Sequence, residues 1–409
     1  MKKSIIIIAA ALAIASCQEN DIKNDLREST QNAPLTFNAY SNKSTKADPT
    51  QSDLNFFYNK FNVYGWKKVN NSWVTDNPVF NNVTNQYFEE DGKGDIYTGT
   101  ETVADEWSTI QGSSAFPGWY YKGIRYWDKF ATEYQFCAYA PIAASSEVEC
   151  TPQGVITIGK AAAPITVEST NLMSTPATAL AYKTFDKDYM TATSKANYST
   201  TANNEAVSLV FTHELAKFNI KLVLDKVNVT TNQAVIVREV SLHKLEGTSY
   251  YDSSKESETG FITGWHTPTT ELAYTLKNGD NGYQLNGDID SEKTGDQNYD
   301  GYYIMERLMV PQTAFKAVDD QSNAINAQAS AYENEEYVYV KYTIGTEPYE
   351  GYYALANLFL GNTNGSSYDF LGGNEYTLTI TVGPRPIYFD ASVTPWVDND
   401  ANKTNIAAN

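Results

Sequence analysis

Apolar and polar residues alternate with a period of two in several separate stretches of the chain. The clearest stretches are Leu35–Ala39, Phe218–Leu224, Val338–Ile344, Tyr376–Val382 and Ile387–Val393. Successive side chains of a strand point to opposite faces, so each stretch predicts a strand with one buried face and one face in water. Such one-sided burial is typical of antiparallel sheets that stack as sandwiches. The pattern therefore predicts an all-β chain.

A polar passage interrupts this series of strands. Residues Thr191–Glu205 are rich in Thr, Ser and Asn, and a chain of 409 residues has the length of two or three domains, of which we expect two. We expect an N-terminal β-sandwich domain over residues 35–200 and a C-terminal β-sandwich domain over residues 206–409, the latter with a possible donor strand.

The first residues predict an export signal. Two lysines precede the apolar run Ile5–Ile14, which is too short to span a bilayer, and the string Ile14-Ala15-Ser16-Cys17 resembles a bacterial lipobox. In such a motif the cysteine thiol is acylated and the cysteine becomes the new N-terminus. We expect residues 1–16 to be a lipoprotein signal peptide, Cys17 to carry the lipid anchor, and residues 17–34 to form a disordered polar tether.

The charge balance excludes several classes of partner. Asp and Glu number 49 against 30 Lys and Arg, which gives a formal charge of −19. Removal of two lysines with the signal peptide takes the charge to −21. A chain this acidic repels nucleic acid and anionic membrane surfaces, so neither is expected as a partner.

The chain contains few residues suited to catalysis or metal binding. It has three His and three Cys, no Gly-x-Ser-x-Gly motif, and no pair of His or Cys at a spacing that suits zinc. His213 lies in an alternating stretch and is expected to be a hydrogen-bonded strand histidine. Asp296–Gly301 resembles the first half of a calcium loop, but position twelve is Arg307 in place of Glu, so loose calcium binding stays open. We predict no enzymatic activity and no cofactor.

Two features allow alternative interpretations. Cys137 and Cys150 could form a disulfide in an oxidising compartment or remain as buried thiols. The aromatic block Phe116–Tyr139 could stack on sugar rings or fill a sandwich core. Alternation of Tyr134 and Phe136 with polar neighbours favours the core.

A series of short strings spans nearly the whole chain after the signal peptide. The strings are the lipobox at Cys17, Leu35-Thr36-Phe37, Thr45-Lys46-Ala47, Phe61-Asn62-Val63-Tyr64-Gly65, Tyr126-Trp127, Tyr134-Gln135-Phe136-Cys137-Ala138-Tyr139-Ala140-Pro141, Phe211-Thr212-His213-Glu214-Leu215-Ala216-Lys217, Gly372-Gly373-Asn374-Glu375-Tyr376 and Val393-Thr394-Pro395-Trp396. In this order they resemble the fimbrillin family, the type V pilins and their fimbrillin-like lipoprotein relatives.

The resemblance implies two transthyretin-like antiparallel β-sandwich domains and a role as an extracellular structural subunit. In such pilins a lipoprotein precursor reaches the outer membrane, a protease cuts after a basic residue, and the first strand of the N-terminal domain leaves. The vacated groove then accepts a C-terminal strand of the next subunit, which completes the open sheet edge.

The resemblance also assigns roles to residues of this chain. The scissile bond is expected at Lys46-Ala47, with Lys43 as a second choice, because both lie in a polar stretch that a protease could reach. The departing strand is expected to carry Leu35, Phe37 and Ala39. The tail after Val397 alternates poorly, so the donor strand candidates lie before it: Ile387, Phe389, Ala391, Val393 and Trp396.

We therefore expect a structural subunit of surface fimbriae that is trimmed and assembled by donor-strand exchange for adhesion. Its partners would be neighbouring fimbrial subunits and, through the lipid on Cys17, the outer membrane. The alternative is a monomeric surface lipoprotein, a tip or accessory adhesin, that binds host or bacterial glycans or proteins. That alternative would use the loop aromatics Trp66, Trp73 and Trp265.

Overall fold

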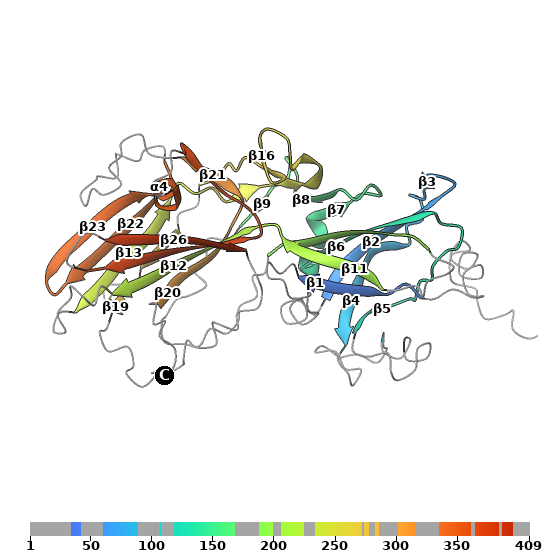
Figure 1. The fold of residues 1–409 in the computed structure, drawn as a ribbon, viewed down its shortest axis with the longest axis horizontal. Helices are drawn as coiled ribbons and strands as arrows, with labels where there is room; N and C mark the ends of the chain where they lie inside the picture. The colour runs from blue at the N-terminus through green and yellow to red at the C-terminus, as the bar shows by residue number, and fades with distance from the viewer. Residues whose placement is uncertain are drawn as a thin grey trace, which may run out of the picture.

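The computed structural model describes residues 34–41, 60–88, 103, 107, 118–167, 188–198, 206–224, 234–271, 274–277, 283–285, 302–315, 335–360, 365–383 and 387–395. These ranges are almost entirely β, as the alternation predicts. The short helices are η1 (Ile142–Ser146), η2 (Ser253–Lys255) and α4 (Leu355–Leu360). No described helix has the length and apolar character needed to cross a membrane. The strands form two large groups with smaller sheets between them (Figure 1).

The first group is an eight-stranded sheet that closes on itself. Its strands are β1 (Phe37–Ser41), β2 (Lys60–Val69), β3 (Ser72–Trp73), β4 (Phe80–Phe88), β5 (Gly118–Tyr121), β6 (Glu133–Ala140), β10 (Met190–Ala196) and β11 (Val207–His213). They follow the order β3-β2-β4-β5-β1-β11-β10-β6, and β2 also pairs with β6. Pairing therefore runs around a ring that includes every strand of this sheet except β3.

The second group is a sandwich of two sheets. One has the order β20-β12-β25-β26, and the other has the order β18-β13-β22-β23 with β19 also on β13. The strands are β12 (Ala216–Leu224), β13 (Val235–His243), β18 (Tyr274–Lys277), β19 (Tyr283–Leu285), β20 (Tyr302–Met309), β22 (Tyr337–Ile344), β23 (Glu347–Ala354), β25 (Asn374–Val382) and β26 (Tyr388–Pro395). Apolar rows of both sheets fill one core between them.

Strand β25 shows the predicted alternation clearly. Tyr376, Leu378, Ile380 and Val382 are buried, and the threonines between them are half-buried. Pairing direction differs from the expectation at two places, because β1 runs parallel to β11 and β12 runs parallel to β25. Alternation depends on which face of a strand is buried and carries no information about the direction of its neighbour. The other described pairs are antiparallel, as expected.

Small sheets lie between the two groups. Their strands are β7 (Val148–Cys150), β8 (Ile156–Ile158), β9 (Ile165–Thr166), β14 (Thr248–Ser249), β15 (Tyr251–Asp252), β16 (Phe261–Ile262), β17 (Trp265–His266), β21 (Gln312–Phe315) and β24 (Ser367–Phe370). Strand β8 pairs with β15 and β9 pairs with β14, so segments from both sides of the expected division at 200–206 join here. The assignment of two domains stays a prediction.

The chain passes from the ring to the sandwich at Glu214 and Leu215. This connection is held by main-chain hydrogen bonds from Glu214 N to Tyr189 O (2.8 Å) and from Gly373 N to Leu215 O (3.0 Å). The indole of Trp265 donates to Glu214 O (2.7 Å). Strand β11 starts after the expected division and still belongs to the ring, so the change of sheet occurs later than residues 200–206.

Candidate assembly strands

Strand β1 and the residues just before it fill the interior of the ring. Leu35 and Ala39 are fully buried, and Phe37 is 2% exposed. The Phe37 ring meets those of Phe80 and Phe136 edge to face, with centroids 5.2 and 5.4 Å away. Aromatic pairs of this kind stabilise a core beyond the area they bury. The three residues predicted to leave with this strand are therefore part of the core.

The main chain around β1 bridges two other strands. It pairs in parallel with β11 from Phe37↔Val207 to Ser41↔Phe211, and it meets β5 at the single pair Phe37↔Trp119. Before the strand, Leu35 N donates to Arg125 O (2.8 Å) and the Tyr121 hydroxyl donates to Leu35 O (2.8 Å). Removal of β1 would open the ring and leave β5 and β11 with unpaired edges next to the apolar side chains of the ring interior.

Strand β26 lies at the end of its sheet. It pairs with β25 from Asn374↔Pro395 to Thr381↔Tyr388, and no other described strand pairs with it. The Phe389 ring lies 4.3 Å from that of Tyr353. Burial falls along the strand, since Ile387 is 8% exposed and Val393 is 43% exposed. Of the donor candidates, the later ones therefore contribute less to the sandwich core.

The segments that contain β1 and β26 have similar sequences. Pro34-Leu35-Thr36-Phe37-Asn38-Ala39-Tyr40 and Pro386-Ile387-Tyr388-Phe389-Asp390-Ala391-Ser392 share Pro, Phe and Ala at the same places and have Leu opposite Ile. The two strands lie in different groups, β1 in the ring and β26 in the sandwich (Figure 1). Sequence reasoning examined each strand by itself and missed this similarity. A comparison of the predicted strands with one another would have found it.

Several predicted site residues lie outside the described residues. These are Cys17, Lys46, Ala47, Trp396 and the calcium-like loop Asp296–Gly301. The expected cut at Lys46-Ala47 falls between the end of β1 and the start of β2. The lipidation, processing and calcium predictions stay predictions.

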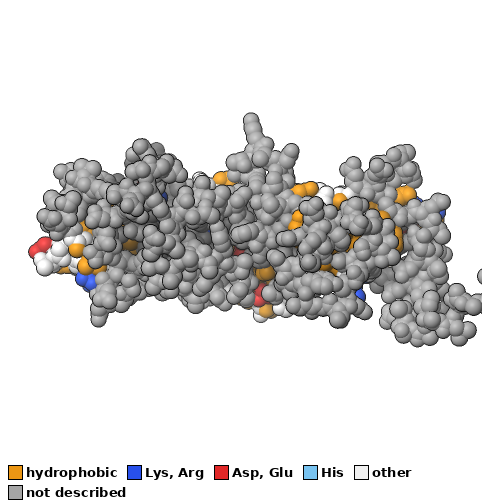
Figure 2. Space-filling view, turned by 90° about the horizontal axis from the view of Figure 1, so that it is seen from below, with side chains coloured by type: hydrophobic (Ala, Val, Ile, Leu, Met, Phe, Trp, Pro, Cys, Tyr) orange, Lys and Arg blue, Asp and Glu red, His pale blue; other side chains and the backbone are white. Residues whose placement is uncertain are grey.

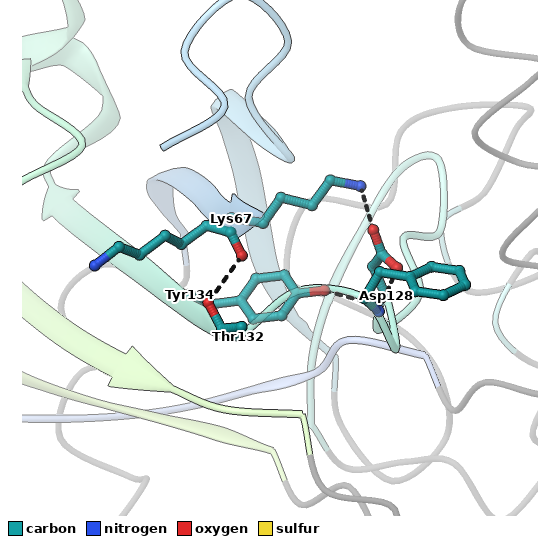
Figure 3. A network of polar contacts seen from close by, with 6 residues as sticks. Lys67, Asp128, Thr132 and Tyr134 are labelled. Carbon is teal, nitrogen blue, oxygen red and sulfur yellow. Dashed lines mark hydrogen bonds and ion pairs between the residues drawn. The ribbon is translucent and has the colours of Figure 1, made fainter. Parts of the chain in front are cut away.

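The described aromatic side chains of the block pack mostly inside the ring, with Tyr139 in the core between the groups, and the loop before Tyr134 is fastened to a neighbouring strand. Tyr134 and Phe136 are fully buried, which confirms the core interpretation. The hydroxyl of Tyr134 accepts from Asp128 N (2.6 Å), and Lys67 Nζ lies 3.0 Å from Asp128 Oδ2. Thr132 N donates to Lys68 O (2.9 Å), so two contacts fasten this loop to β2 (Figure 3). Phe130 is an exception in the block at 64% exposure.

The tryptophans expected to bind glycans do not form an exposed surface. Trp66 is 6% exposed and Trp265 is fully buried. Trp73 is half-buried, and Lys68 Nζ lies 5.6 Å from its ring centroid. The expectation of a glycan surface built on Trp66 and Trp265 was wrong, because both rings pack in the core between the groups.

Two buried polar side chains near the connection between ring and sandwich, His213 and Glu214, make hydrogen bonds within the fold. His213 Nδ1 lies 2.9 Å from Asp188 Oδ1 at a buried position, which confirms the hydrogen-bonded strand histidine. The carboxylate of Glu214 accepts from the hydroxyls of Thr191 and Thr212, and burial raises the pKa of Glu214 from 4.5 to about 7. Among the described residues, no three His, Cys, Asp or Glu side chains group closely enough to hold a metal ion.

Figure 2 shows described residues of one face only in small areas, in which hydrophobic side chains and a few separate Lys, Arg, Asp and Glu side chains are visible.

Comparison with known proteins identifies a family. The model of the family described as fimbrillin-like matches residues 45–396. Similar solved structures include a fimbrial protein of Bacteroides vulgatus (13% identity, 89% of this chain and 99% of that one, TM-score 0.47) and the tip fimbrial protein Mfa3 of Porphyromonas gingivalis (10% identity, 90% and 100%, TM-score 0.41). A putative cell adhesion protein of Bacteroides uniformis is also similar (14% identity, 89% and 98%, TM-score 0.41).

These structural likenesses are too weak to assign a function, and no curated protein matches the chain. The family match is different in kind, because it spans most of the sequence and includes every string of the resemblance except the lipobox at Cys17 and Leu35-Thr36-Phe37. The chain belongs to the fimbrillin-like family.

Proposed function

We propose that this chain is a structural subunit of surface fimbriae that joins its neighbours by exchanging a strand. Membership of the fimbrillin-like family supports a non-enzymatic fimbrial or adhesion subunit that associates with other fimbrial subunits. The similarity between Pro34–Tyr40 and Pro386–Ser392 is the observation that supports the proposed strand exchange most directly.

The place of β1 in the ring favours its replacement by another strand. The slot that it fills is bounded by β5 and β11, and its floor includes the buried rings of Phe80 and Phe136. A strand that enters this slot gains main-chain hydrogen bonds from the open edges and buries alternate side chains. The slot therefore selects a strand by the sizes of three alternating side chains.

The segment 386–392 meets that requirement. Placed in the direction of β1, it would put Ile387 where Leu35 lies, Phe389 where Phe37 lies and Ala391 where Ala39 lies. Swaps that conserve the volume of a core side chain are tolerated best; two of these three positions keep the residue itself, and Ile in place of Leu keeps its size. In its own sandwich β26 is an end strand with one described partner, so it has fewer contacts to lose than a central strand.

Proteolysis between β1 and β2 would release the first strand. A cut at Lys46-Ala47 separates β1, which ends at Ser41, from the rest of the ring, which resumes at Lys60. We assign the precursor to the outer membrane through lipid on Cys17 and the processed subunit to the fimbrium. Acyl chains on the cysteine would hold the precursor until this cut.

The test starts from precursor carrying Cys17→Ser, which is treated with a Lys- or Arg-specific protease. Cleavage near Lys46 should be followed by SDS-resistant ladders on a gel. Phe389→Asp should abolish the ladders, because a carboxylate cannot enter the apolar slot without a partner. Ser392→Asp, on an exposed position of the same strand, is the matched control and should leave the ladders intact.

A peptide of residues 386–395 shows whether the Phe389→Asp variant fails because its strand cannot enter the slot or because the variant does not fold. It should bind the cleaved wild-type protein and stop the growth of ladders, whereas the same peptide with Phe389→Asp should not. Cleavage without ladders and without peptide binding would reject the exchange. Peptide binding without ladders would instead support a tip or accessory adhesin, which accepts a strand and donates none.

A further inference from the structure

Two cysteines outside the assembly strands pack in the core between the groups. Cys137 is in the middle of β6 and is fully buried, while Cys150 ends β7 and is half-buried. Cys150 packs against the buried cluster that includes Cys137, and both are free cysteines. Cys137 Sγ also lies 4.0 Å from the carbonyl oxygen of Thr151, the residue after Cys150. The chain between them turns back through η1.

The two thiols have different access to solvent. Cys137 is paired in the sheet between Tyr64 of β2 and Thr193 of β10, so its sulfur faces the small sheet above the ring. Cys150 is at the rim of the same cluster, next to Thr151, with part of its surface in water. The hydrogen bond with Cys137, and then burial, raise the pKa of the Cys150 thiol. Cys150 is therefore held as a thiol, and it is the one of the two cysteines that a reagent in water can reach.

We propose that Cys137 and Cys150 are a redox site that oxidises to a disulfide joining β6 of the ring to β7 of the small sheet. The oxidant is another disulfide, for example oxidised glutathione or an oxidoreductase of a secretory compartment. Cys150 loses its proton and, as the thiolate, attacks one sulfur of that disulfide; a mixed disulfide forms, and the released thiolate takes up a proton to become one thiol. Cys137 then attacks Cys150 Sγ and releases the second thiol.

The electrons and protons of this exchange balance. Two S–H bonds of the protein are lost and one S–S bond forms, while the oxidant gains two electrons and two protons as its own two thiols. The bond would fix the loop through η1 and tie the small sheet to the ring on the side away from β1 in the strand order. A cross-link between elements that already touch stabilises the fold chiefly by restricting the unfolded chain.

The experiment uses the full chain with Cys17→Ser, so that only these two cysteines remain. The folded protein is incubated with a mixture of reduced and oxidised glutathione, acid-quenched, unfolded and labelled with a maleimide of known mass. The expected result is no label, an intact mass lower by two hydrogens, and a peptide pair that contains Cys137 linked to Cys150. Two labels per chain after this treatment would overturn the proposal, as would dimers on a non-reducing gel.

Stability provides a second readout. Reduction of the oxidised protein should lower its Tm by about 5 °C or more. The double variant Cys137→Ala with Cys150→Ala should melt at the same temperature with and without reductant. An unchanged Tm of the oxidised protein on reduction would show that the bond does not fasten the sheets. None of these measurements depends on strand exchange, so the two proposals fail separately.

Discussion

Glu214 illustrates how a single residue responds to its surroundings. In the sequence it is one of 49 acidic residues and lies between His213 and Leu215. In the fold its carboxyl group is buried at the connection between ring and sandwich, where Glu256 adds a further repulsive charge. Local sequence could not predict this burial, because the covering side chains of Tyr251 and Trp265 come from a segment far along the chain.

The raised pKa of Glu214 predicts a loss of stability as pH rises. Below pH 4.5 the carboxyl group is protonated in both the folded and the unfolded chain, and between pH 4.5 and about 7 only the unfolded chain loses the proton. The free energy of unfolding should therefore fall by about 3 kcal/mol over this window relative to Glu214→Gln. Urea denaturation at a series of pH values measures it.

Glu149→Gln is the control for that series, since Glu149 is exposed and should leave the pH profile unchanged. If the free energy of unfolding changed with pH in the same way in wild type and in Glu214→Gln, the carboxyl group of Glu214 would not be the titrating group. A steeper fall in the variant would contradict the sign of the effect.

At the scale of single elements, alternation identified strands but not their neighbours. The stretches at Leu35, Phe218, Val338, Tyr376 and Ile387 all correspond to described strands. Their partners depend on contacts between segments far apart in sequence, such as β1 with β11 and β8 with β15. The closed ring and the pairing across residues 200–206 could not be predicted for that reason. The departing strand and the donor candidates could be predicted from the sequence, but the slot between β5 and β11 became visible only when the strands were placed.

Strand β1 should be essential to the stability of the uncleaved precursor. Phe37→Ala removes a ring that packs against Phe80, Phe136 and Tyr121, and should lower the free energy of unfolding by about 3–5 kcal/mol. Urea denaturation of the purified precursor measures this change. A loss below about 1 kcal/mol would mean that the ring closes without this side chain.

Val210→Ala tests whether the loss of stability in Phe37→Ala depends on the position of the side chain inside the ring. Val210 lies on β11, directly beside β1, but its side chain is 42% exposed. The substitution should change the free energy of unfolding by no more than about 0.5 kcal/mol. If both variants lost the same free energy of unfolding, the cause would be damage to the β1–β11 pairing and not the cavity left by the Phe37 ring.

At the scale of the whole molecule, the charge opposes association. Each subunit carries −19, or −21 after loss of the signal peptide, and like charges on neighbours repel. The proposed assembly would therefore have to overcome this repulsion with the free energy gained when the donor strand enters the slot.

Salt should accelerate the proposed assembly. Between about 10 mM and about 150 mM ionic strength the screening length falls from about 30 Å to about 8 Å, which weakens repulsion between whole subunits. The rate of ladder formation after protease treatment should rise severalfold, as followed by densitometry of gels. Sucrose at matched osmolality should leave the rate unchanged, and a rate that falls with salt would point to attractive charge pairs at the contact.

The parallel pairing of β1 with β11 also has a kinetic consequence. Phe37 is paired with Val207, 170 positions further along the chain. A chain that emerges from its N-terminus first carries β1 without its neighbour until nearly half of the sequence has followed. Pairings with such long separations are slow to form, because the loop between them must be ordered first. The ring can therefore close only late in folding, and the strand made earliest is among the last to find its place.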